Sequence, residues 1–349
     1  MVKQTPMDII KNYDGPKIRI MEVCGTHTHE IFRLGIRSLL SDKIQLISGP
    51  GCPVCVTAVD YIDEAIYLAE KGVTICTFGD LVRVPGTRSS LAKQRAQGAK
   101  VQVVYAPIDA VDYAQKHPEE EVVFLSVGFE TTTPSSLLAV KTAIKRQLTN
   151  FSILTANKTM PQAYEAMKDS TDVFLYPGHV HAITGTQLLE DLAASGTSGV
   201  VAGFTAKELV TALAVAVYKF SEGKPFFVNA YPRVVTHDGS PSAIAMVEEM
   251  MEPVDVEWRG IGIIPQSGLK LKDEFAAYDA RVKYDIPAME GRVNPVCRCG
   301  EVLQGKCQPT DCRVFGTGCT PEHPIGACMV SGEGACSAYY LYKGSGLYE

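Results

Sequence analysis

The chain has 349 residues, of which 46% are hydrophobic and 21% charged, and its formal net charge is −6. This length exceeds one typical domain, and the apolar content is sufficient for ordinary hydrophobic cores. Charges of both signs are mixed along a mildly acidic chain, which argues against a nucleic-acid-binding surface.

No targeting or membrane segment is expected. Residues 1–17 are polar and lack the apolar stretch of a signal peptide. A transmembrane helix needs about 18 uninterrupted apolar residues, and no such run is present. We therefore expect a cytoplasmic protein, in which thiols stay reduced. Its eleven cysteines are then expected to bind metal or to act as redox groups, and a disulfide framework is not expected.

The first part of the chain alternates short apolar runs with helical patterns. The expected strands are 17–23, 43–48, 73–78 and 101–105. The expected helices are 31–40, 57–71, 91–97 and 108–115. This alternation is typical of a parallel sheet with helices on both faces. We therefore predict a first α/β domain over residues 1–117.

A second series of the same kind follows the polar segment 117–121, which we interpret as a linker. The expected strands are 122–127, 151–156, 173–176, 199–203 and 226–230. The expected helices are 135–147, 161–167, 187–194 and 206–220. These elements predict a second α/β domain over residues 118–234.

The character of the chain changes in a third part, which we place at residues 235–349. A helix is expected at 242–251 and a strand with a turn at 258–265. From residue 294 onward Gly, Pro and Cys dominate and the periodicity fades. Because such a tail has little apolar area to bury, a metal site could supply the missing stabilisation.

Thiols near the N-terminus follow two of the expected strands. Cys24 comes directly after the first strand, and Cys52 and Cys55 form a C-x-x-C after the second. Ligands of doubly wound sheets lie beyond the carboxyl ends of the strands, so these thiols and the segment 78–80 are expected at one sheet edge. This arrangement favours a soft-metal or dithiol site. The alternative is a C-x-x-C that is merely buried, with Cys24 unrelated to it.

Histidines accompany both α/β series. His27 and His29 lie beside Cys24 and could carry protons or bind metal, or His27 could only hydrogen-bond the loop backbone. The loops 128–134 and 176–181 also follow strands, and they could bind a ligand or only cap helices. Cys76 lies inside an apolar strand and is expected to be a core residue.

The tail carries seven cysteines whose spacing matches neither bacterial ferredoxins nor paired zinc ribbons. They are Cys297, Cys299, Cys307, Cys312, Cys319, Cys328 and Cys336. Four thiolates can hold zinc or a [4Fe–4S] cluster, and spacing alone does not choose between them. We expect Cys307 to be a bystander because its neighbours are polar.

Several motifs together resemble the HypD family of hydrogenase maturation factors. They are Met21–Glu22–Val23–Cys24–Gly25–Thr26–His27, Gly49–Pro50–Gly51–Cys52–Pro53–Val54–Cys55, Gly128–Phe129–Glu130–Thr131–Thr132, Cys297–Arg298–Cys299–Gly300–Glu301–Val302–Leu303, Cys319–Thr320–Pro321 and Met329–Val330–Ser331–Gly332–Glu333–Gly334–Ala335–Cys336. The combination is specific, and the resemblance covers nearly the whole chain.

The resemblance implies two Rossmann-like α/β domains and a third part that binds a [4Fe–4S] cluster. It also implies a scaffold that, with the chaperone HypC, holds iron while CN and CO ligands are added. HypE, with HypF, supplies cyanide, and the iron then passes to the hydrogenase large subunit precursor.

The family's residues carry over to numbered positions of this chain. Cys24, Cys52 and Cys55 match its iron-site and redox thiols, and His27 belongs to the same motif. Cys312, Cys319 and Cys336 match cluster ligands, and the fourth comes from Cys297 or Cys299. Cys328 and Cys307 are lower-ranked alternatives.

Two other functions stay open on the sequence alone. A cluster-dependent thiol/disulfide oxidoreductase would turn over a disulfide without HypC. A zinc-stabilised α/β binding protein would be colourless. We favour the assembly scaffold, which is not a conventional turnover enzyme.

Overall fold

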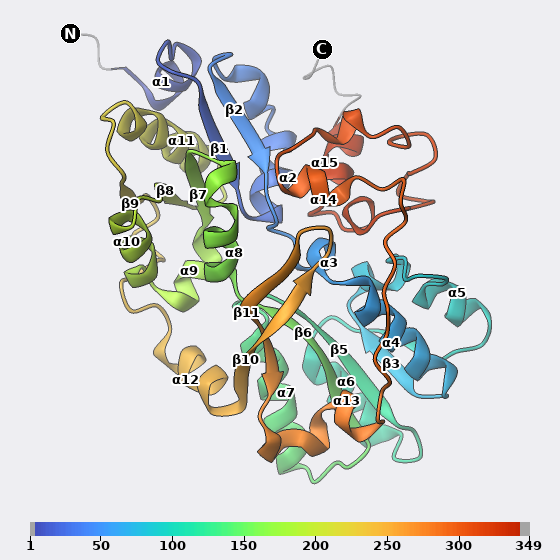
Figure 1. Ribbon diagram of the computed structural model, residues 1–349. Helices are drawn as coiled ribbons and strands as arrows, with labels where there is room; N and C mark the ends of the chain where they lie inside the picture. The colour runs from blue at the N-terminus through green and yellow to red at the C-terminus, as the bar shows by residue number, and fades with distance from the viewer. Residues whose placement is uncertain (1–3, 343–349) are drawn as a thin grey trace.

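The computed structural model describes residues 4–342, which form two sheets and a loop-rich, cysteine-rich C-terminal part (Figure 1). The first sheet has the order β2-β1-β7-β8-β9, and all its neighbouring strands are parallel. Its strands are β1 (Ile18–Glu22), β2 (Ile44–Ser48), β7 (Val173–Pro177), β8 (Gly199–Ala202) and β9 (Phe227–Asn229). The predicted α/β class with parallel sheets is thus confirmed.

The second sheet has the order β10-β11-β6-β5-β3-β4. Strands β3, β4, β5 and β6 run parallel to one another. Strand β11 pairs antiparallel with both β6 and β10. The strands are β3 (Thr74–Thr77), β4 (Val101–Val103), β5 (Val122–Gly128), β6 (Phe151–Lys158), β10 (Met251–Trp258) and β11 (Gly262–Leu271). Every residue of β5 is buried, as expected for a continuous apolar run in a parallel sheet covered on both faces.

The helices lie mainly between successive strands, as the alternating pattern predicts. The α-helices are α1 (Pro6–Lys11), α2 (Gly25–Arg33), α3 (Pro53–Val56), α4 (Val59–Glu70), α5 (Leu91–Ala96), α6 (Pro107–Lys116), α7 (Thr133–Lys145), α8 (Met160–Met167), α9 (Gly178–Thr184), α10 (Gln187–Ala194), α11 (Ala206–Phe220), α12 (Pro241–Met250), α13 (Ala280–Lys283), α14 (Cys299–Leu303) and α15 (Ala335–Tyr342). Within residues 4–342 none of these helices combines the length and apolar character that membrane crossing requires.

One predicted helix begins much earlier than the pattern indicates. The expectation was a helix over 31–40, but α2 begins at Gly25 and ends at Arg33, and a separate 3-10 turn covers Ile36–Leu39. Gly35 between them has a φ of +63°. This left-handed conformation suits glycine and interrupts the helix.

The sheets group the strands differently from the predicted boundaries at residues 117 and 234. Figure 1 shows β1 and β2 beside β7 and β8, far along the chain, and β1 pairs with β7 through Met21 and Phe174. β3 and β4 instead join β5. The β10–β11 hairpin lies in the predicted third part, where the sequence indicates only a strand with a turn at 258–265. It extends the second sheet through Leu269 and Asn157. Periodicity predicts which residues form strands, but it carries no information on which strands pair.

A buried ion pair connects the first sheet to the tail. The Arg37 guanidinium donates to the carboxylate of Glu22, whose side chain is fully buried in β1. The Ser48 hydroxyl in β2 also donates to Glu22 (3.0 Å). Arg37 lies 4.7 Å from the Phe32 ring centroid and 5.8 Å from that of Tyr339 in α15. Burial raises the pKa of Glu22, while the charge of Arg37 lowers it.

We expect Arg37→Met to lower the free energy of unfolding by about 3 kcal/mol, because it leaves the Glu22 carboxyl buried without its cation. The loss should grow between pH 5.5 and pH 8. Without Arg37 the folded-state pKa of Glu22 rises further above its usual value of 4.5. The folded variant then binds the proton more tightly than the unfolded chain, and stability is lost as the pH rises through that window.

Urea unfolding at the two pH values measures this effect. The matched control is the double variant Glu22→Gln/Arg37→Met, which should recover most of the stability and lose the pH dependence. An Arg37→Met protein that unfolds at the same urea concentration as the unsubstituted protein would contradict the role of the pair.

Candidate metal and thiol site

A pocket of about 370 Å³ lies where the carboxyl ends of strands from both sheets meet. Its lining comes from the segments after β1, β2, β5, β7 and β8 and from the tail: Cys24, Thr26, Gly51, Pro53, Phe129, Thr131, Thr132, His179, Phe204 and Glu333. The location agrees with the general rule that ligands of parallel sheets bind beyond the carboxyl ends of the strands.

Cys24 lies in this pocket at the start of α2. Its segment packs closely on the Cys52 loop, because the Gly25 amide donates to Gly51 O (3.0 Å). A Cβ on Gly51 would lie only 2.0 Å from the Cys24 backbone nitrogen, so this approach requires glycine. Burial raises the pKa of Cys24 to about 12; the His27 amide opposes this shift, and the Glu333 carboxylate adds to it. Without a metal, Cys24 is therefore a neutral thiol near pH 7.

His27 lies behind the pocket wall. Its Nε2 is 3.0 Å from Gly203 O, and its ring packs 4.8 Å from the ring of Phe204, which lines the pocket. Burial lowers the pKa of His27 to about 3, so the ring is neutral near pH 7. The observed contact is the backbone hydrogen bond that the sequence left open as an alternative, and a role in chemistry stays a prediction.

The other histidines divide between the pocket and the framework. His179 lines the pocket, and burial lowers its pKa to about 4. His181 is buried and hydrogen-bonds Tyr164 (3.1 Å). His29 instead contacts the tail, with Nδ1 3.3 Å from Gly332 O.

The C-x-x-C forms the short helix α3, with Cys52 as its N-cap residue. The Cys52 sulfur accepts a hydrogen bond from the Cys55 amide (3.2 Å). Both thiols are buried, and burial raises the pKa of Cys55 well above its usual value. Cys55 lies beside the Cys328 thiol of the tail. The C-x-x-C is thus buried, but it is buried against other thiols.

The tail gathers five of its seven cysteines near α3. Cys328 lies beside Cys299 and Cys336, and Cys297 lies beside Cys299. The Cys319 sulfur, in the same apolar cluster as these thiols, accepts from the Ile325 amide (3.3 Å). The neighbouring Cys299 thiol and burial raise the pKa of Cys297.

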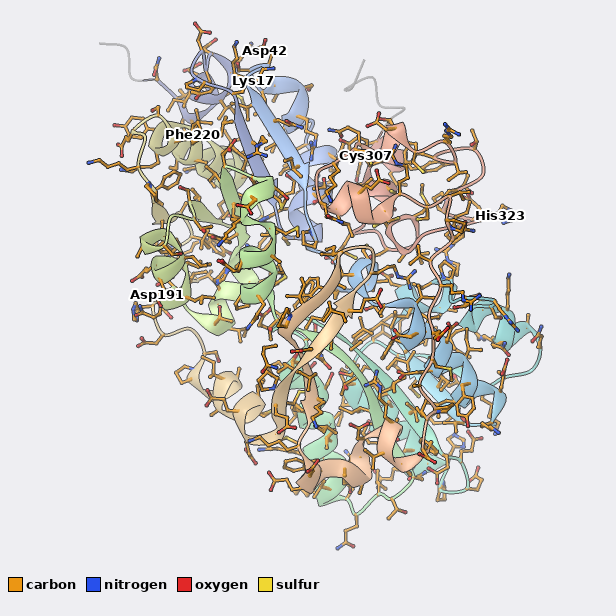
Figure 2. The ribbon with its side chains drawn as sticks, in the orientation of Figure 1. Lys17, Asp42, Asp191, Phe220, Cys307 and His323 are labelled. Carbon is orange, nitrogen blue, oxygen red and sulfur yellow. The ribbon has the colours of Figure 1, made fainter. Side chains whose placement is uncertain are left out.

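Cys312 and Cys307 lie at the margin of this group. Both are half-buried, and burial raises the pKa of Cys307. The Cys312 sulfur is 3.9 Å from Val296 O. Cys307 lies over β2, beside Gln45 and Ile47, whereas His323 is at the outer edge of the tail (Figure 2). The ligand role expected for Cys312 therefore stays a prediction. Cys328, which the sequence analysis named only as a lower-ranked alternative ligand, lies at the centre of the group of thiols.

The segment 78–80 and the loop after β5 reach the same region from the second sheet. Asp80 accepts a hydrogen bond from Ser331 of the tail (2.9 Å). Thr131 and Thr132 line the pocket, while the Thr133 hydroxyl donates to Phe129 O (3.0 Å).

The loop after β5 also holds a buried carboxyl group. Glu130 accepts a hydrogen bond from the Met160 amide (2.7 Å), and burial raises the pKa of Glu130 to about 7. Cys76, by contrast, is in the core of the second sheet, as predicted.

Sequence reasoning missed Glu333 and Phe204 as pocket residues. Thr26 donates to Glu333 (2.8 Å), although the two residues are 307 positions apart. Glu333 stands in one of the motifs that carried the family resemblance, which was the available signal for it. Phe204 follows β8 at a position with no local sign of function, because only the pairing of β8 with β7 brings it to the pocket.

The residues of the tail fit a sulfur-ligated metal centre. A Cβ on Gly326 would lie 2.5 Å from the Cys297 sulfur and 2.6 Å from the Cys299 sulfur. Glycine therefore leaves space beside two thiols, in a region where further thiols are adjacent. Thiolates are the ligands that zinc and iron–sulfur clusters use. The clustered cysteines thus suit metal binding, and the donor set does not distinguish the metal.

Comparisons with known proteins agree with these features. A family model labelled HypD and described as "Hydrogenase formation hypA family" matches residues 1–343. The hydrogenase maturation factor HypD of Cupriavidus necator is 42% identical over 342 residues, which cover 94% of this chain and 90% of the relative.

Two further relatives extend the comparison. The hydrogenase maturation factor HypD2 of Bradyrhizobium diazoefficiens is 43% identical, over 93% of this chain and 89% of its own length. A putative hydrogenase expression/formation protein of Methanocaldococcus jannaschii is 38% identical, over 94% and 92% respectively. The match to the family model and the near full-length similarity show that this chain belongs to the HypD family of hydrogenase maturation factors.

Proposed function

We propose that this hydrogenase maturation factor is a cytoplasmic scaffold that, together with HypC, holds an iron ion while CN and CO ligands are added. Cys24, Cys52 and Cys55 would bind the iron, and a [4Fe–4S] cluster would be bound by thiols of the tail. HypE would supply cyanide, and the iron would then pass to the hydrogenase large subunit precursor. The observation that carries this proposal is the pocket at Cys24, which adjoins the C-x-x-C and its tail thiols.

The chemistry of the residues suits this cargo. Iron that bears CO and CN ligands is a soft centre, for which thiolates are good ligands. Because burial keeps Cys24 protonated, iron binding there must release a proton, and binding should strengthen as the pH rises. Phe129, Phe204 and Pro53 give the pocket apolar walls, which limit the access of water. We place HypC at the opening of this pocket, because iron must be delivered there.

The tail would hold the cluster through Cys319, Cys336, one of Cys297 and Cys299, and Cys312 or Cys328. A bound [4Fe–4S] cluster supplies one-electron transfer. Cys52 and Cys55 can bind iron as thiolates or pair as a disulfide, and oxidation of the two thiolates to a disulfide releases two electrons and no proton.

One observation favours a second candidate, a cluster-dependent thiol/disulfide oxidoreductase. Cys55 lies beside Cys328 of the tail, so the C-x-x-C is close to the thiols that would hold the cluster. Turnover of a small or protein disulfide without HypC would favour this candidate. Hydrogenase maturation that requires HypC, without such turnover, favours the scaffold.

Anaerobic purification followed by iron, sulfide and zinc analysis tests the cofactor. About four irons and four sulfides per chain with a brown colour are expected for the cluster. Zinc in a colourless protein would overturn the cluster and support a structural zinc site.

Cys52→Ala should abolish hydrogenase maturation without unfolding the protein, because it removes one proposed iron ligand and only a single buried sulfur. The measurement is hydrogenase activity in a host that lacks its own HypD and expresses the variant. Cys76→Ala is the matched control, since Cys76 is equally buried in β3. Normal hydrogenase activity with Cys52→Ala, at the expression level of the control, would refute the assignment.

Cys319→Ser should lose iron, sulfide and visible absorbance together, and its tail should become sensitive to proteolysis. Cys307→Ser is the control and should keep its iron, its sulfide, its visible absorbance and the resistance of its tail to proteolysis. The same measurements on Cys312→Ser and Cys328→Ser identify which of the two thiols is a ligand. A Cys319→Ser protein with the full iron and sulfide content would remove this residue from the ligand set.

A further inference from the structure

Arg259 lies at the tip of the β10–β11 hairpin and is 4% exposed. Its amide donates to Val56 O (2.9 Å), its Nε to Thr57 O (2.6 Å) and its Nη1 to Pro85 O (3.4 Å). Val56 and Thr57 directly follow Cys55 at the end of α3. The backbone and side chain of Arg259 are therefore both fixed to the C-x-x-C segment. Figure 1 shows the hairpin tip beside α3.

The same hairpin tip is also fixed to the tail. Gly260 has a φ of +72°, and a Cβ on it would lie 2.6 Å from the Gly300 Cα of α14. Gln304 donates to Gly260 O (2.8 Å). α14 begins with Cys299, so these contacts hold Arg259 at a fixed position relative to the tail thiols.

The guanidinium is not fully satisfied by these hydrogen bonds. Its Nη2 is buried and has no hydrogen-bond partner among the residues that the structure describes. Burial lowers the pKa of Arg259, and thiolate charge on Cys299, Cys328, Cys297 or Cys55 would oppose this shift. Arg259 and Cys299 also line one pocket of about 380 Å³ with Cys297. A buried cation with an unpaired donor is costly unless negative charge lies beside it, and thiolate sulfur would supply that charge.

We propose that Arg259 is the fixed positive charge that sets the reduction potential of the thiolate-ligated cluster in the tail. This inference rests on the cluster of the proposed function. Addition of one electron from an external one-electron reductant makes a thiolate-ligated centre more negative by one charge. A buried cation stabilises the reduced form more than the oxidised form, and it therefore raises the potential. No bond or proton needs to change, because guanidinium stays charged in proteins.

The test is a redox titration of the purified full-length protein under anaerobic conditions, with dithionite as reductant and the reduced cluster followed by electron paramagnetic resonance. Arg259→Gln keeps a donor for Thr57 O but removes the charge. At a fixed applied potential its ratio of reduced to oxidised cluster should fall at least tenfold, which corresponds to a midpoint lower by about 59 mV. Arg259→Lys keeps the charge and should stay within about threefold of the unsubstituted protein.

Arg292→Gln is the matched control. Arg292 lines the same pocket, but its side chain is 78% exposed, so its charge is screened by water and its removal should leave the potential unchanged. If Arg259→Gln is not recovered in folded form, Arg259→Met, which keeps most of the aliphatic stem, is measured against Arg259→Lys in its place.

The outcomes separate this inference from the proposed function. An unchanged potential in Arg259→Gln with a full complement of iron and sulfide overturns the role of Arg259 and leaves the cluster intact. Equal shifts in Arg259→Gln and Arg292→Gln also overturn it, because they indicate a general effect of net charge. An unsubstituted protein without a four-iron cluster overturns the proposed cofactor, and the inference falls with it.

Discussion

The hydrogen bonds from Arg259 to Val56 and Thr57, together with the one from Gln304 to Gly260 O, hold together the C-x-x-C segment, the hairpin and the tail. α3 is only four residues long, and a helix of one turn has little stability of its own. Its position therefore depends on neighbours, chiefly the β10–β11 hairpin and the tail. The hairpin in turn belongs to the second sheet, whereas the loop that leads into α3 comes from β2 of the first. Each sheet thus needs the other to place Cys52 and Cys55.

The interleaved order of the strands has a consequence for how the pocket forms. β1 reaches its second neighbour only when β7, in which Val173 is the partner of Ile20, has been added to the sheet. The pocket walls come from five strand ends and from Glu333 near the end of the chain. Folding of the complete chain is thus required before Cys24 acquires its surroundings, and a fragment that ends at residue 117 lacks most of the pocket.

Local patterns predicted most elements, because burial of an apolar run is a local property of the sequence. The run from Val122 to Gly128 is an example. Local patterns could not predict that β1 pairs with β7, since no feature of Met21 identifies Phe174 as its neighbour. For the site, the positions of the thiols after the first two strands predicted that the Cys24 and Cys52 segments lie together, and the Gly25 amide does donate to Gly51 O. The thiol chemistry itself stays a prediction. The convergence of Cys328 on Cys55, and the burial of Arg259 near both, arise from tertiary packing, so the spacing of residues along the chain could not predict them.

Protonation connects the thiols of α3 with those of the tail. Burial raises the pKa of Cys55, and contact with Cys299 raises that of Cys328, so both are neutral thiols near pH 7 in the absence of metal. Metal binding needs thiolates and must release these protons. In the proposed function, thiolates of the C-x-x-C and of the tail would both supply negative charge near the unpaired Nη2 of Arg259. Loading of either proposed site would then change the electrostatic environment of the other, and by thermodynamic linkage the effect would be mutual.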